Sequence, residues 1–191
     1  MFDIVVKLKS ASPFSFGTPA RTPKDANESD DAHDKRVFRE RCYVGQDGYI
    51  IIPRSMFKNA VADTAKHMGE KIPGKGSATW TKHFEAGIHV LSDIKTKWKP
   101  ADTPFEDVYC YAQGHKSDSE GRVWRRFVVF PEWDGEILFR VVDPAITAKQ
   151  FLKTLRMTGL IMGIGRWPLR NRGGYGAFAV LEYSISNERL L

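Results

Sequence analysis

The most distinctive chemistry of this sequence lies in its last quarter, where basic residues occur without any carboxylate. Between residues 144 and 181 there are six basic residues and no aspartate or glutamate. Within that stretch, residues 159–178 combine six glycines, three arginines and three aromatic residues. Glycine lets a backbone approach a ligand closely, arginine pairs bidentately with phosphate, and aromatic rings stack on bases. The stretch therefore predicts a nucleic-acid contact surface.

The candidate binding side chains form three groups. Arginines of the loop are expected to neutralise phosphates, and two aromatic residues beside them to stack on bases or wedge between them. A helix before the loop carries three basic residues on one face, and a lysine-rich region at 66–99 adds two more. These side chains are Lys75, Lys82, Lys149, Lys153, Arg156, Arg166, Trp167, Arg170, Arg172 and Tyr175.

Two plainer interpretations stay open for these segments. The glycines could simply turn a surface loop while Tyr175 and Phe178 pack inward. Likewise, the lysines of 66–99 could form a solvated face around two core tryptophans. Nucleotide-cofactor motifs are excluded, because Gly163-Ile164-Gly165 follows a helix and lacks a third glycine, and no Lys-Ser/Thr pair completes a P-loop.

The sequence offers little for catalysis or metal binding. Five histidines show no metal-ligand spacing with one another or with Cys42 and Cys110, so neither a metal nor a cofactor is expected. His83 could act as a general base in RNA cleavage if it lies near a phosphate path. Nothing in the residues requires an enzyme.

Composition sets the broad class. The 191 residues carry a formal net charge of +6, and 42% are hydrophobic, which suits one folded domain with a polyanionic partner. No apolar run approaches the roughly 20 residues of a membrane span, and the N-terminus does not resemble a signal peptide. We expect a cytoplasmic protein of a bacterial or phage-infected cell.

Hydrophobic periodicity predicts the elements that position these residues. Helices are expected at 55–68 with Ser55 as cap, at 77–84, and from Thr147, whose hydroxyl and Gln150 form a capping-box pattern. A turn at 45–48 is expected to join two strands into a hairpin. The predicted strands are 2–8, 37–44, 49–52, 87–91, 108–113, 122–130, 136–142 and 175–185.

Without its insertions, this order is β-α-β-β-α-β, an α+β class of ferredoxin-like (RRM-like) arrangement. The chain, 1–191, is expected to be a single nucleic-acid-binding domain with insertions at about 10–52 and 71–104. The segment 10–34 is expected to be a long polar loop. Its Phe14 and Phe16 could clamp a bound strand or reach a neighbouring copy.

The order of elements, the helix that starts after Ile52-Pro53, and the late glycine-rich loop resemble the RAMP superfamily. These are RNA-binding subunits of CRISPR-associated complexes, including the backbone subunit that polymerises along guide RNA, and the loop also looks like that of small phage proteins of this fold. The resemblance implies that several copies bind one single strand. It also implies backbone and phosphate contact at Gly163, Gly165, Arg166, Arg170, Arg172, Gly173 and Gly174.

The sequence therefore predicts a non-enzymatic protein that binds single-stranded RNA or DNA and forms a homo-oligomer or filament on it. Other subunits of a nucleoprotein complex are further candidate partners. One alternative is a metal-independent endoribonuclease of the same superfamily. Another is a phage protein-binding module that docks on a nucleoprotein complex. RNA and DNA are not distinguished, because 2′-hydroxyl contacts leave no signature in composition.

Overall fold

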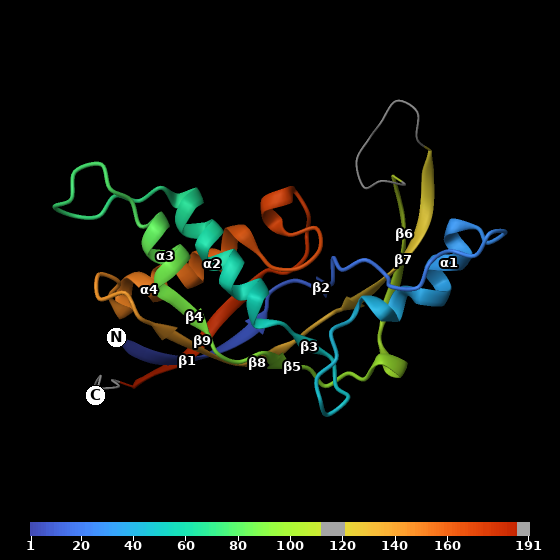
Figure 1. Cartoon of the computed structure of the whole chain (residues 1–191), viewed down its shortest axis with the longest axis horizontal. Coiled ribbons are helices and arrows are strands. Elements are labelled where there is room, and N and C mark those ends of the chain that lie inside the picture. Colours follow the sequence, from blue (N-terminus) through green and yellow to red (C-terminus); the bar gives the residue numbers. More distant parts are fainter. Residues whose placement is uncertain (112–120, 187–191) are drawn as a thin grey trace.

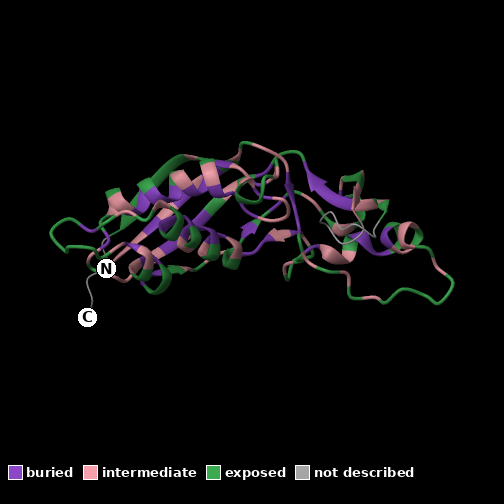
Figure 2. Cartoon of the chain, turned by 90° about the horizontal axis from the view of Figure 1, so that it is seen from above, coloured by how far each residue is buried: buried purple, intermediate pink, exposed green. Residues whose placement is uncertain are grey.

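The computed structural model describes residues 1–111 and 121–186. The molecule is elongated: a helix-covered sheet forms one end, and a two-stranded ribbon with a short helix forms the other (Figure 1). Seen from above, buried segments run through both ends (Figure 2). Within the described residues, no helix combines the length and the apolar character needed to cross a membrane.

Four antiparallel strands form the main sheet, in the order β4-β8-β1-β9. The alternation of β1 sends Ile4, Val6 and Leu8 to one face, where all three are fully buried. Strand β1 lies in the middle, so that Ile4 is paired with Phe139 on one side and with Ile185 on the other. The bounds are β1 Phe2–Ser10, β4 Ile88–Val90, β8 Asp134–Val141 and β9 Phe178–Ser186.

Helix α2 (Arg54–Met68) packs on this sheet through an apolar stripe that includes Phe57, whose ring meets that of Phe178 at 5.8 Å. The helix ends at Gly69, where φ is +58°, a conformation that glycine adopts without a steric cost. The prediction that Ser55 caps it is wrong. Pro53 takes the N-cap position in extended geometry, which leaves Ser55 inside the first turn.

Helix α4 (Ala148–Met157) covers the same sheet, and its Phe151 packs edge-on against Phe139 at 5.0 Å. Thr147 caps it as expected, since its hydroxyl accepts a hydrogen bond from the Gln150 N–H at 3.2 Å. The Gln150 side chain does not complete the capping box. It donates to Glu70 instead, at 3.2 Å.

The α+β fold class is confirmed. The strands of the main sheet and its two long helices follow one another as β1, α2, β4, β8, α4 and β9, which corresponds to the β-α-β-β-α-β pattern with other elements inserted. The inserted elements include α3 (Thr81–Gly87), which lies a few residues later than the predicted helix, and a small pair of β3 (Ile51–Ile52) and β5 (Ile94–Lys95).

A second sheet, in the order β2-β7-β6, forms the other end of the molecule. Its long strands β6 (Phe105–Tyr111) and β7 (Arg122–Phe130) make an antiparallel ribbon, and β2 (Phe14–Ser15) joins the end of β7. The predicted strand 108–113 agrees with β6 as far as Tyr111, and its last two residues lie outside the described part of the chain.

The prediction for 10–34 is corrected. Phe14 and Phe16 are 0% and 2% exposed, so their rings belong to the core and are not free to clamp a strand or reach a neighbouring copy. The segment also includes β2 and the start of α1 (Asp30–Val37), which packs against β7. Ser29 caps α1, accepting a hydrogen bond from the Ala32 N–H at 3.1 Å.

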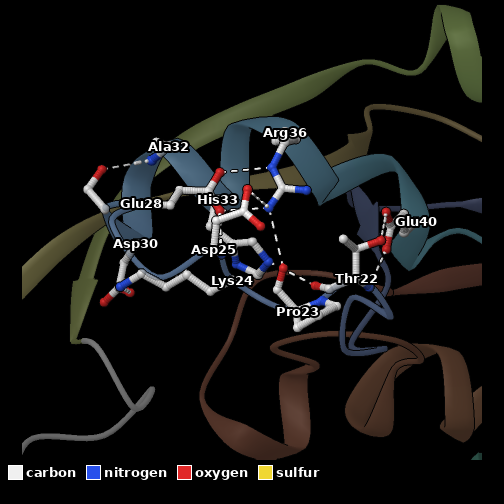
Figure 3. Close-up of polar contacts among 11 residues, drawn as sticks. Thr22, Pro23, Lys24, Asp25, Glu28, Asp30, Ala32, His33, Arg36 and Glu40 are labelled. Carbon is white, nitrogen blue, oxygen red and sulfur yellow. Dashed lines mark hydrogen bonds and ion pairs between the residues drawn. The ribbon is translucent and has the colours of Figure 1, made fainter.

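Ion pairs hold the acidic part of this segment on α1 (Figure 3). Arg36 donates from Nε and Nη2 to the two carboxylate oxygens of Glu28, at 2.8 and 2.7 Å, which lowers the pKa of Glu28 to about 2. Glu40 accepts from the Thr22 hydroxyl at 2.7 Å. These contacts show why the run of carboxylates is folded back rather than extended into solvent.

The predicted strand 37–44 is wrong, because α1 is followed directly by a 3₁₀ turn at Phe38–Arg41. The turn at 45–48 does form, with the Gly48 N–H bonded to the Gly45 carbonyl at 3.0 Å. The hairpin around it is reduced to a single bridge between Val44 and Ile50. The strand was expected as one arm of a hairpin around the 45–48 turn, and the tertiary packing of Val37 and Phe38 overrides that expectation.

Candidate nucleic-acid interface

The glycine-rich loop begins with a π-helical turn, Thr158–Met162, at the end of α4. Its two limbs are bonded to each other and to the segment around β2. The Ile164 N–H donates to the Gly176 carbonyl at 3.0 Å, and the Arg166 N–H donates to the Ser15 carbonyl at 2.7 Å. The loop is therefore a closed structure fixed between the two sheets.

Two of its glycines are required by the loop's own packing. A Cβ at Gly176 would lie 1.8 Å from the Ile164 carbonyl oxygen, and one at Gly173 would lie 1.7 Å from the Trp167 carbonyl oxygen. Gly174 has open space around its Cβ position, so nothing in the fold requires a glycine there. The interpretation that glycines shape the loop therefore accounts for Gly173 and Gly176.

A groove of about 320 Å³ opens beside the loop, between its first limb and helix α2. Gly163 and Gly165 of the loop line it, as does Asn59 of α2. The segment after β2, Tyr43 and Arg170 also contribute to the lining. The lining residues are Gly17, Thr18, Pro19, Tyr43, Met56, Asn59, Ala60, Gly163, Ile164, Gly165 and Arg170.

Arg166 lies in the interior of the loop and is only partly exposed. Its guanidinium stacks over the Phe127 ring, 3.7 Å from the centroid. Among the described residues its Nε is buried and has no hydrogen-bond partner. Burial and the nearby Arg41 lower the pKa of Arg166 to about 10, so it stays charged at neutral pH in a site that favours an added anion.

The other candidates of the loop differ in exposure. Arg170 and Arg172 are both exposed. Arg170 pairs with Asp63 of α2 at 2.5 Å. The backbone of Arg172 is in the left-handed region, with φ +61°. Trp167 packs edge-on against Phe127 at 5.3 Å. The Tyr175 hydroxyl donates to Glu106 at 2.9 Å, and burial together with this carboxylate raises the pKa of Tyr175 to about 12.

The remaining candidate lysines and Arg156 lie on a different part of the surface. Lys149, Lys153 and Arg156 are exposed on α4, and Lys75 and Lys82 are exposed in the α2–α3 loop and in α3. Lys153 makes an ion pair with Glu70, which ties α4 to the α2–α3 loop. The structure thus brings the predicted binding residues together in two groups, and their role in binding stays a prediction.

Sequence reasoning missed the exposed face of the β6–β7 ribbon. Tyr109 and Trp124 are cross-strand partners, 51% and 54% exposed, with ring centroids 5.3 Å apart. The neighbouring pair places the Arg122 guanidinium 5.0 Å from the centre of the Tyr111 ring. Period-two alternation in both strands was the available signal, since it assigns these residues to one face.

On the same face, closer to the core, the Arg126 guanidinium lies 4.0 Å from the Phe105 ring centroid. It also bonds to both oxygens of Asp107, at 2.8 and 2.7 Å. The ribbon therefore presents a ladder of aromatic and cationic side chains to solvent. Such a surface can stack with planar groups and attract anions.

His83, the candidate base, is held by a carboxylate. Its Nδ1 lies 2.6 Å from Oδ2 of Asp143, whose Oδ1 accepts from the Ala145 N–H at 2.8 Å. Burial raises the pKa of Asp143, but the hydrogen bonds from Ala145 and His83 outweigh it and hold that pKa below its usual value. Within the described residues, no cluster of three potential metal ligands is found.

Comparison with known proteins finds neither a matching family model nor a matching curated sequence. Similar solved structures include Cmr6 from Pyrococcus furiosus, with 11% identity, coverage of 94% of this chain and 98% of that one, and a TM-score of 0.46. A Cas6 product complex has 14% identity, covers 93% of this chain and 51% of that one, and has a TM-score of 0.35. Both likenesses are remote in sequence and in structure.

Proposed function

We propose that this protein binds single-stranded nucleic acid. The observation that carries the proposal is the solvent-facing aromatic ladder of the ribbon, with Tyr109 and Trp124 at its centre and Arg122 beside them. Base stacking on aromatic rings contributes about 1–3 kcal/mol per base and tolerates any sequence. Bases of a duplex are already stacked on one another, so this surface favours a single strand.

The glycine-rich loop supplies the complementary contacts to the backbone. Arg166 provides a partly buried guanidinium that forms no ion pair among the described residues, since the nearby Asp34 pairs with Arg41 and Arg125. Arg172, six residues later, is exposed. The net charge of +6 adds a long-range attraction for a polyanion. In this proposal the ribbon binds bases and the loop binds phosphates, and neither role calls for a cofactor.

A pair of matched variants tests the proposal. Arg170→Ala/Arg172→Ala removes two charges from the loop, and Lys9→Ala/Lys24→Ala removes two exposed charges elsewhere. Anisotropy with labelled single-stranded RNA and DNA is expected to show weaker binding for the loop variant and near-normal binding for the control. Equal effects of the two variants would contradict a specific role of the loop. Comparing the RNA and DNA curves also determines which strand the protein prefers.

We also expect several copies of the protein to bind along one nucleic-acid strand. The measurement is the number of copies bound as the length of the oligonucleotide increases. A protein that purifies free of nucleic acid, binds none, and carries a tight protein partner would instead support the protein-docking function.

The second candidate function, RNA cleavage without a metal, is favoured by the His83–Asp143 pair. With Nδ1 directed at the carboxylate, Nε2 is left to accept a proton from an RNA 2′-hydroxyl. The 2′-oxygen would then attack the adjacent phosphorus, and the 5′-oxygen would leave with a proton from solvent. Incubation of labelled RNA with EDTA tests this: cleavage lost in His83→Ala and kept in His89→Ala, which alters an exposed histidine of β4, would support an enzyme.

A further inference from the structure

Strand β9 forms one edge of the main sheet, and the structure leaves that edge open. It is paired with β1 on one side, and no described strand pairs with its other side. The strand is nine residues long, and residues 181–186 are all exposed. An open edge of this length presents unpaired N–H and C=O groups to any strand that can align with it.

The edge is also apolar. Leu181, Tyr183 and Ile185 are 51%, 49% and 43% exposed, although such side chains are usually buried. Tyr183 and Ile185 are paired with the fully buried Val6 and Ile4 of β1, so they point to the helix-covered side of the sheet. There they extend past the packed core as a hydrophobic ledge beside the hydrogen-bonding edge.

Natural edge strands are normally protected by charge, proline or a bulge directed against pairing. The only charged residue of β9 is Glu182, and it lies opposite Lys7 of its own sheet. A bulge occurs next to it in β9, where Leu181 has no partner between the pairs Val180–Leu8 and Glu182–Lys7. The segment 182–186 beyond the bulge has no proline and no second charge, so little in it opposes the addition of a strand.

We propose that this edge pairs with the same edge of a second copy, in antiparallel orientation, to join two sheets into one. In such a pair a two-fold axis relates the two copies. The residue on the axis faces its own counterpart, and residues at equal distances before and after it face each other. Centred on Tyr183, the register places Tyr183 opposite Tyr183 and Glu182 opposite Ser184, within the regular segment that follows the bulge. In each of these cross-strand pairs at least one residue is uncharged, so no like charges face each other and pairing is favoured.

The neighbouring register supports this choice by contrast. Centred on Glu182, the two carboxylates would face each other directly, and like charges at that position are destabilising. A second copy also fits the charge of the edge better than a nucleic acid would, because residues 178–186 contain no basic side chain and one acidic one. The proposal is independent of the nucleic-acid function, which involves the loop and the ribbon.

Sedimentation or light scattering of nucleic-acid-free protein tests the proposal. The wild type is expected to show, as concentration increases, twice the 21.7 kDa mass of one chain. Tyr183→Lys and Tyr183→Glu are each expected to remain at the single-chain mass, because like charges would meet at the axis. An equimolar mixture of the two variants is expected to restore the double mass, since lysine then faces glutamate.

Trp124→Lys serves as the control, because it places a charge at an exposed aromatic of the ribbon and is expected to leave the dimer unchanged. Circular dichroism confirms that all variants are folded. A wild type that stays at the single-chain mass at every concentration would overturn the proposal, as would a mixture of the two Tyr183 variants that does not dimerise. Binding of nucleic acid by the single-chain variants, measured separately, keeps the two proposals distinguishable.

Discussion

The two sheets of this protein use antiparallel strands for opposite purposes. The main sheet directs Ile4, Val6 and Leu8 beneath two helices, and its large side chains pack against one another. The ribbon instead directs Tyr109 and Trp124 to solvent. The comparison teaches that strand periodicity places residues on faces, while covering elements decide whether a face stabilises the fold or is free to bind.

The largest expected effect concerns the packed core of the main sheet. Phe139→Ala removes a fully buried ring that packs at 5.0 Å on Phe151, and we expect a loss of about 3–5 kcal/mol in the free energy of unfolding. Chemical denaturation measures it. The matched ribbon variant Tyr109→Ala should change stability far less, and equal losses for both would break the comparison.

The loop between the two sheets is tested next, by glycine substitution. Gly176→Ala is expected to destabilise the protein by about 1–3 kcal/mol, because φ is +76° and the new Cβ would meet the Ile164 carbonyl. Gly174→Ala, in open space, is the control for stability. If Gly174→Ala weakens binding of a single strand while leaving the melting temperature unchanged, a ligand approaches the backbone there.

Trp124→Ala tests whether the exposed face of the ribbon binds a single strand. Loss of one stacking ring is expected to weaken single-strand binding by about 1–3 kcal/mol, with almost no change in stability, since the side chain is 54% exposed. Fluorescence anisotropy and thermal melting measure the two quantities. Normal affinity in this variant would remove the ribbon from the interface.

The smallest effect concerns the ion pair that holds the acidic segment at the ribbon end. The pKa of Glu28 falls from an ordinary value of 4.5 to about 2 through its bonds with Arg36. The stability it adds is therefore present above pH 4.5 and lost as pH falls towards 2. We expect the difference in melting temperature between wild type and Glu28→Gln to shrink over this window. A difference that is independent of pH would contradict the assignment.

The sequence was informative where periodicity and burial agree. Strand β1 and helix α2 were predicted almost to their ends, because their apolar residues recur at strand and helix spacing and are buried on one side. Helix α1 was missed because its residues are mainly charged, and its stability comes from contacts with β7 and from ion pairs such as that of Lys35 with Asp31. Local propensity does not contain those partners.

The candidate site, too, could be predicted only in part from the sequence. The arginines and aromatics of the loop were visible as a composition, but the surroundings of Arg166 depend on Phe127 and Arg41, which are distant in sequence. The burial of Phe14 and Phe16 reversed their expected role for the same reason. A pattern identifies which residues can do chemistry, and only the assembled fold shows which of them face solvent.

The dependence of binding on salt tests the central claim most directly. If the three arginines of the loop, Arg166, Arg170 and Arg172, neutralise phosphates of a single strand, the logarithm of the binding constant should fall with the logarithm of salt concentration with a slope of roughly −2. Replacing all three with alanine should bring the slope near zero. Absent binding, a slope near zero in the wild type, or an unchanged slope in the triple variant would contradict the account.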